Sequence, residues 1–98
     1  MTPETLKDYE ERGARLLYTV QLAISALDRI TPERIMIIDA QDAPELMEEA
    51  FLEWFRAHDA DTQEVLAHVC ERLHYQEIWL SNPKAQEAVL LFKPEKPN

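Results

Sequence analysis

The chain has 98 residues, of which 46% are hydrophobic, and its formal net charge is −9 at neutral pH. This length predicts one domain over residues 1–98, without room for separate catalytic and regulatory domains. The acidic balance argues against direct binding of nucleic acid or of an anionic membrane surface, because both require clustered Lys and Arg side chains. A basic protein surface is the partner that this charge favours.

The cellular compartment is inferred from the cysteine content and the hydropathy pattern. The single cysteine, Cys70, excludes an internal disulfide and suits a reducing environment. The sequence contains neither a basic and apolar leader nor an apolar run approaching 18 residues. We therefore expect a cytoplasmic protein that does not span a membrane.

The first part of the chain predicts a long amphipathic helix. Thr2-Pro3-Glu4 supplies a capping hydroxyl, a proline and an acid, and a second Thr-Pro-Glu places the end of the helix near residue 30. Apolar residues recur every three or four positions for about four heptads, which suits packing in a bundle or a homodimer. The residues of this seam are Leu6, Tyr9, Gly13, Leu16, Val20, Ala23, Leu27 and Ile30.

Charged residues on the same helix should pair along its exposed side. Asp8 with Arg12, and Glu11 with Arg15, are separated by four residues in the favourable order, with the acid first. Each such pair stabilises an exposed helix by about 0.2 to 0.5 kcal/mol. We expect both pairs to remain within the helix and in contact with solvent.

The rest of the chain also favours helices. Residues 35–38 fit either a short buried helix or a short buried strand, and the preceding capping signal favours the helix. Further helices are predicted over about 44–57 and 62–80, followed by a short one that begins near Pro83. The apolar phase of the second is lost at Gln76-Glu77, so a bend, an end or a change to strand near Tyr75 stays open. Glycine occurs only once, whereas tight hairpins usually need it. Residues 93–98, which include two prolines, predict a flexible tail.

The predicted fold class is therefore all-α, a compact bundle of four to five helices built on the long N-terminal heptad helix. An α+β fold stays open as the alternative, with Ile35–Ile38, Ile78–Leu80 and Ala88–Phe92 as a small three-stranded sheet. The good helix formers between the second and third of these runs, together with the scarcity of glycine, count against that hairpin.

Most of the negative charge lies between Asp39 and Glu64, a stretch that we call the acidic segment. It holds nine acids and one base, Arg56, so nine negative charges and one positive give −8 of the total of −9. Acids three or four residues apart on the predicted helix over 44–57 would form a row along one face. Such a row can occupy a basic groove, although an ordinary solvated helix face has the same pattern. The residues expected to bind a partner are Glu45, Glu48, Glu49 and Glu53.

Other candidates for chemistry are weaker. Glu71 and His74, three residues apart on a predicted helix, could both reach one metal ion, but a site would need a second such pair from a dimer. The apolar phase of that helix directs Glu71 away from the buried face, so surface positions are favoured and we expect no metal or cofactor. Cys70 lies on the buried face, where a thiol behaves as a small hydrophobic group rather than a nucleophile.

These observations lead to a functional hypothesis and two alternatives. The leading hypothesis is a non-enzymatic binding or regulatory protein that presents an acidic helix to a basic partner, possible examples being an inhibitor or a nucleic-acid mimic of the phage anti-defence type. The first alternative is a small dimeric metal-binding helical protein that uses Glu71 and His74. The second is a structural subunit that dimerises through the first helix.

Overall fold

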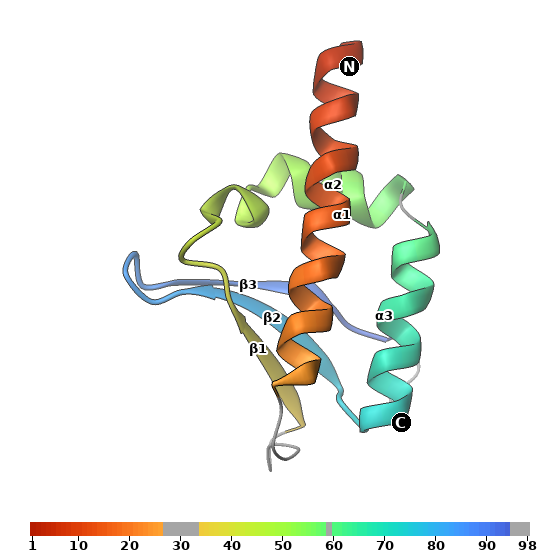
Figure 1. Cartoon of the computed structure of the whole chain (residues 1–98), viewed down its shortest axis with the longest axis vertical. Helices are drawn as coiled ribbons and strands as arrows, with labels where there is room; N and C mark the ends of the chain where they lie inside the picture. The colour runs from red at the N-terminus through yellow and green to blue at the C-terminus, as the bar shows by residue number, and fades with distance from the viewer. Residues whose placement is uncertain (27–33, 59, 95–98) are drawn as a thin grey trace.

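The computed structural model describes residues 1–26, 34–58 and 60–94, which form an α+β fold (Figure 1). The all-α prediction is therefore wrong, and the three-stranded sheet considered as its alternative is present. The predicted end of the first helix near residue 30 and most of the predicted tail lie outside the described residues. In chain order the elements are helix α1 (Pro3–Ser25), strand β1 (Ile35–Asp39), 3-10 helix η1 (Pro44–Met47), helices α2 (Glu49–His58) and α3 (Ala60–Leu73), and strands β2 (Glu77–Asn82) and β3 (Glu87–Phe92).

The sheet is mixed, with the strand order β1-β2-β3. Strand β1 runs parallel to β2, and the connection between them contains η1, α2 and α3, whereas β2 and β3 form an antiparallel hairpin. Alternate strand residues face the helices and are buried. Helix α1 contacts β1 and α2, and its first turns extend beyond the rest of the molecule (Figure 1). The buried strand residues are Met36, Ile38, Ile78, Leu80 and Leu91.

Helix α1 starts as the sequence predicts, and the middle of its heptad seam faces the core of its own domain. Thr2 caps the helix by accepting a hydrogen bond of 3.1 Å from the backbone N–H of Thr5. Gly13, Leu16 and Val20 are buried in the seam. These three residues contribute to the core of the domain, so they are not exposed on its surface.

Helix α3 ends earlier than predicted because His74 takes a left-handed conformation. The helix ends at Leu73, and His74 has φ of 61°. The next N–H, of Tyr75, donates to the Cys70 carbonyl at 3.0 Å, which closes a Schellman-type helix end. Both Tyr75 and Cys70 are fully buried, so their contact anchors the turn that directs the chain into β2.

The β2–β3 hairpin also turns without glycine. The N–H of Ala85 donates to the carbonyl of Asn82, the N–H of Gln86 donates to that of Pro83, and Gln86 has φ of 54°. A glutamine therefore occupies a left-handed position at which glycine would be the usual residue. This turn replaces the helix that was predicted to follow Pro83.

No helix among the described residues combines the length and the hydropathy needed to cross a membrane.

Candidate functional site

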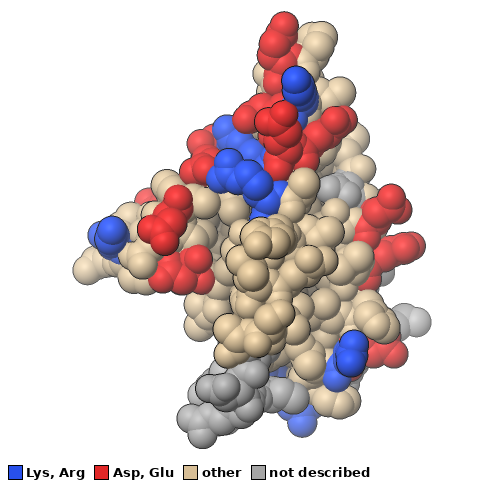
Figure 2. All heavy atoms as spheres, viewed as in Figure 1, with Lys and Arg blue, Asp and Glu red and all other residues tan. Residues whose placement is uncertain are grey.

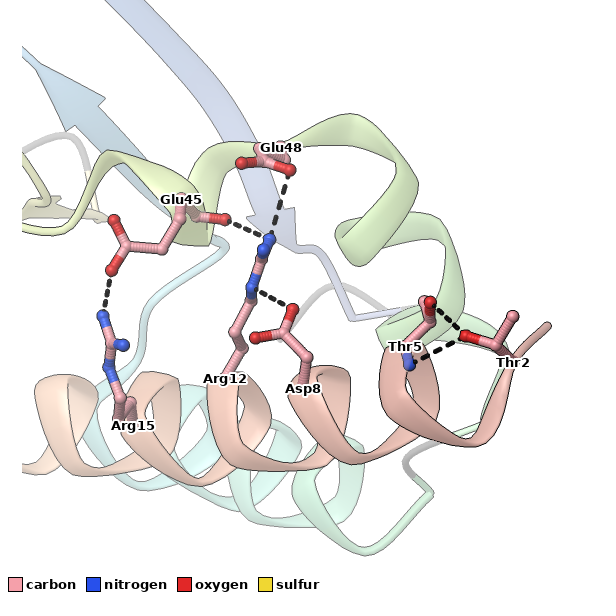
Figure 3. Close-up of polar contacts among 7 residues, drawn as sticks. All are labelled: Thr2, Thr5, Asp8, Arg12, Arg15, Glu45 and Glu48. Atoms are coloured by element: carbon pink, nitrogen blue, oxygen red, sulfur yellow. Dashed lines mark hydrogen bonds and ion pairs between the residues drawn. The ribbon is translucent and has the colours of Figure 1, made fainter.

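Arg12 of α1 holds the start of the acidic segment against the helix (Figure 3). Its guanidinium lies 2.9 Å from the carboxylate of Asp8 and 3.2 Å from that of Glu48, and it donates a hydrogen bond of 3.1 Å to the Glu45 carbonyl. Only 17% of the Arg12 side chain is exposed. Partial burial opposes the charged form, but the carboxylates of Glu48 and Asp8 outweigh it and raise the pKa of Arg12.

Arg15, one turn further along α1, binds the carboxylate of Glu45 (Figure 3). The pair bridges two segments that are 30 residues apart in the sequence. Hydrogen bonding by Arg15, assisted by a backbone N–H, lowers the pKa of Glu45 below its usual range. Arg15 therefore pairs across the fold, and the predicted partner within the helix, Glu11, does not take that role; the predicted pair of Asp8 and Arg12 is confirmed.

An aromatic cluster beneath Arg12 joins α1 to α2. The ring of Tyr9 lies 5.7 Å from that of Phe51 and 5.6 Å from that of Trp54, measured between centroids. The Arg12 guanidinium carbon lies 5.7 Å from the Tyr9 centroid and 5.9 Å from the Phe51 centroid, within the range of cation–π attraction. One arginine thus combines three ionic or polar contacts with packing on two rings.

The four glutamates predicted to bind a partner divide into two pairs. Glu45 and Glu48 are engaged by Arg15 and Arg12, as described above. Glu49 and Glu53 are exposed one turn apart on α2, and neither forms an ion pair with another described residue. The predicted helix over 44–57 is interrupted at Glu48, whose backbone is extended with ψ of 130°. The even row of carboxylates expected along that helix is therefore absent.

The acidic side chains gather in separate places on the surface. Figure 2 shows them around the N-terminal part of α1 and along the side of the molecule occupied by α3, with an uncharged band between these groups over the C-terminal half of α1. Residues 16–25 of that half contain no Asp, Glu, Lys or Arg. Two of its apolar side chains, Tyr18 and Leu22, are more than half exposed.

The structure places the two residues of the alternative metal pair in different local conformations. Glu71 is exposed on α3, whereas His74 lies beyond the end of that helix in its left-handed turn, so the helical spacing on which the pair depended is lost. Within the ranges that the structure describes, no group of three or more His, Cys, Asp or Glu side chains is placed to hold a metal ion. Cys70 is fully buried, and the burial raises the pKa of its thiol to about 11, which disfavours the reactive thiolate at neutral pH.

A groove of about 630 Å³ lies between α3 and β3. At one end Arg56 of α2 donates a hydrogen bond to the backbone carbonyl of Leu90, so the arginine covers part of the open side of β3. The charged lining is balanced, with two acids and two bases. These are Arg56, Glu64, Glu71 and Lys93.

The face of the sheet that points away from the buried strand residues carries a row of apolar side chains that the sequence analysis did not identify as a surface. Ile37 of β1 stands beside Trp79 of β2, and Trp79 stands beside Leu90 of β3. Ile37 is 67% exposed. The run of apolar residues over 35–38 was the available signal, but assigning these residues to two faces of a sheet requires knowing that they form a strand.

Known proteins offer no guide to the function. No protein-family model matches the sequence, and neither a curated protein nor a solved structure matches it. What the chain does is therefore inferred from its own side chains.

Proposed function

We propose that this protein is a non-enzymatic binding protein that captures a basic protein surface through the exposed acids of α2. The observation that carries the proposal is the pair Glu49 and Glu53, which are exposed one turn apart and form no ion pair with other described residues. Unpaired carboxylates on a helix attract a complementary cationic surface without first breaking an existing contact.

The charge of the whole molecule assists this capture. A net charge of −9 on 98 residues attracts a basic partner over about the Debye length, roughly 10 Å at 0.1 M salt, and so raises the rate of encounter. Glu48 stands beside the pair but is already neutralised in part by Arg12, and Glu45 by Arg15. Most of the binding free energy should therefore come from Glu49 and Glu53.

Binding of a basic protein surface in general is favoured over the narrower hypothesis, mimicry of nucleic acid. Mimicry of a phosphate backbone relies on charges at regular intervals, whereas the extended backbone at Glu48 separates Glu45 on η1 from the two glutamates on α2. Dimerisation through the heptad seam loses support because Leu16 and Val20 are buried inside the domain.

A charge-reversal experiment tests the proposal. The wild-type chain and the Glu49→Lys/Glu53→Lys variant are immobilised and used to capture proteins from a lysate of the source organism at low and high salt. We expect the wild type to retain a basic protein at low salt and to release it at high salt, and we expect the variant not to retain it.

The matched control is Glu71→Lys/Glu87→Lys, which makes the same change of four charge units at exposed positions on α3 and β3. The control should keep the partner. Equal loss in both variants would mean that capture depends only on net charge, and full retention by Glu49→Lys/Glu53→Lys would exclude α2 as the binding site. Circular dichroism of each variant verifies that the fold is unchanged.

A further inference from the structure

The first turns of α1 carry the beginning of the heptad seam past α2 (Figure 1). Gly13, Leu16 and Val20 of the seam are buried, whereas Leu6, two turns before Gly13, is 40% exposed. Tyr9 lies between them and is partly buried. Because these residues recur every three or four positions, they share one side of the helix. The stripe that enters the core therefore continues as an exposed apolar face on the projecting part of α1.

The contact between α1 and α2 at this face is aromatic and reaches the solvent. Tyr9 lies 5.6 Å from Trp54, measured between ring centroids, and Trp54 stacks on His58 at 6.0 Å. Within the described ranges, neither the Tyr9 hydroxyl nor the Trp54 indole N–H forms a hydrogen bond, and neither atom is buried. Tyrosine and tryptophan with an apolar ring against the protein and a polar group in water are the side chains that dominate protein interfaces.

Acidic side chains stand beside this apolar face on both helices. On α2 the exposed Ala50 is four residues before Trp54, so the two share a row, and the exposed Glu49 and Glu53 form the next row around the helix. On α1 the exposed Glu10 lies one turn after the exposed leucine. A partner that covers the apolar face would therefore meet carboxylates next to it.

This combination fits a basic amphipathic helix. Its apolar stripe would cover Leu6 and Trp54, while Lys and Arg side chains along the border of the stripe would meet Glu49 and Glu53. A second copy of this chain fits less well, because each copy has a net charge of −9 and two copies would bring like charges together. A basic surface without an apolar stripe would leave Leu6 exposed.

We propose that the basic partner captured by α2 binds as an amphipathic helix, with its apolar stripe on Leu6, Tyr9 and Trp54 and its cationic side chains on Glu49 and Glu53. This inference rests on the proposed function, because both use the same two glutamates. It adds that apolar contact at the projecting part of α1 selects among basic partners. Capture by charge alone does not require that contact, so the selection can fail while the capture holds.

Two synthetic peptides serve as probes. Both have about 20 residues, enough for a helix to form, and contain the same leucines and lysines. In the first peptide the leucines recur every three or four positions and form an apolar stripe, whereas in the second the order is scrambled and the stripe is lost. Fluorescence anisotropy of dilute, labelled peptide measures the dissociation constant of each. We expect the wild type to bind the first peptide about tenfold more tightly than the second.

Variants of two leucines on the same helix locate the apolar contact. Leu6→Gln should weaken binding of the amphipathic peptide about tenfold and leave the scrambled peptide unaffected. Leu22→Gln is the matched control, because it makes the same change at a leucine of α1 that is 53% exposed but lies outside the proposed contact. It should bind both peptides as the wild type does. Glu49→Lys/Glu53→Lys should weaken binding of both, and circular dichroism verifies that each variant is folded.

The emission of Trp54 reports whether the peptide covers the junction of α1 and α2. The chain has two tryptophans, so Trp79→Phe leaves Trp54 as the only one. We expect its emission to shift to shorter wavelength when the amphipathic peptide binds, because the peptide removes water from the exposed part of the indole. A bound peptide that leaves this emission unchanged would overturn the proposal.

The remaining outcomes separate this inference from the function on which it rests. Equal affinity for the two peptides, or equal effects of Leu6→Gln and Leu22→Gln, would overturn the amphipathic helix and leave capture by the two glutamates intact. Binding of both peptides that is insensitive to Glu49→Lys/Glu53→Lys would overturn the proposed function, and this inference with it. A wild type that dimerises in sedimentation velocity and becomes monomeric in Leu6→Gln would assign the face to a second copy and overturn the basic helix.

Discussion

Two pairs of glutamates within nine residues have different surroundings. Glu45 and Glu48 meet Arg15 and Arg12 of α1, whereas Glu49 and Glu53 project from α2 with no ion pair to a described residue. All four have the same chemistry and belong to the same acidic segment. Their difference arises because the chain is extended at Glu48, which places the first pair toward α1 and begins the second pair on a new helix.

The comparison separates charge that supports the fold from charge that is available for binding. An acid that meets an arginine in the folded state stabilises that state, and part of its field is cancelled for any outside partner. An acid without such a partner does the reverse, because it adds repulsion to the fold and leaves its field free. Variants of Glu45 and Glu48 should therefore affect stability more than binding, whereas variants of Glu49 and Glu53 should affect binding more than stability.

The largest expected effect on stability comes from Arg12, which contacts Glu45 and Glu48. Arg12→Met keeps an apolar stem over Tyr9 and Phe51 but removes the contacts with Asp8, Glu45 and Glu48. We expect the free energy of unfolding to fall by about 2 kcal/mol, because several polar contacts of a mostly buried side chain are lost together. Urea denaturation at pH 7 measures the change.

The control for Arg12→Met is Lys7→Met, at an exposed basic residue of the same helix. Its effect should stay within about 0.5 kcal/mol. If the two variants were equally stable, Arg12 would not be the residue that fixes the acidic segment to α1.

A smaller effect is expected from the pair of Arg15 and Glu45, and it should depend on pH. The folded state lowers the pKa of Glu45, so its contribution is present above the pKa of the unfolded chain, about 4.3, and is lost as the pH falls through the folded value. Because both side chains are partly exposed, we expect Glu45→Gln to cost only about 0.2 to 1 kcal/mol at pH 7.

A series of denaturation curves between pH 7 and pH 3 follows this difference. The wild type should lose its advantage over Glu45→Gln as the pH drops, because protonated Glu45 no longer forms an ion pair with Arg15. A difference that stays constant with pH would mean that the Glu45 side chain acts through its shape rather than its charge.

The elements that the sequence predicts well are those whose signal is local. Thr2-Pro3 marks the start of α1, and the heptad spacing identifies Gly13, Leu16 and Val20 as inward residues, as the structure confirms. The pairing of Asp8 with Arg12 also follows from a separation of four residues. Each inference needs only the geometry of one helix, so no knowledge of the fold is required.

The sheet was predicted only as the alternative fold, in part because its turns lack glycine. His74 and Gln86 adopt positive φ without being glycine, and the scarcity of glycine counted against the hairpin that connects β2 to β3. A left-handed conformation costs a residue with a Cβ roughly 1 to 2 kcal/mol, and here tertiary contacts such as the buried Tyr75 compensate for it. Sequence propensity alone does not contain that compensation.

The division of the glutamates was also beyond a local analysis. Arg12 and Arg15 reach residues more than 25 positions away, and packing such as that of Tyr9 on Phe51 and Trp54 brings those segments together. The sequence predicted that the acidic segment is a feature of the surface. Which of its acids are neutralised depends on tertiary structure.

The smallest expected effect on stability comes from changing Glu49 and Glu53. Glu49→Gln with Glu53→Gln removes two charges separated by four residues, which relieves a repulsion of a few tenths of a kcal/mol, while Glu49 also gives up a small favourable interaction with the start of α2. We expect the free energy of unfolding at pH 7 to stay within about 0.5 kcal/mol of the wild type. Urea denaturation measures this change, and capture of the basic partner by the same variant should be strongly reduced. A loss of stability as large as that of Arg12→Met would show that the exposed acids support the fold after all, and the distinction between the two pairs would then fail.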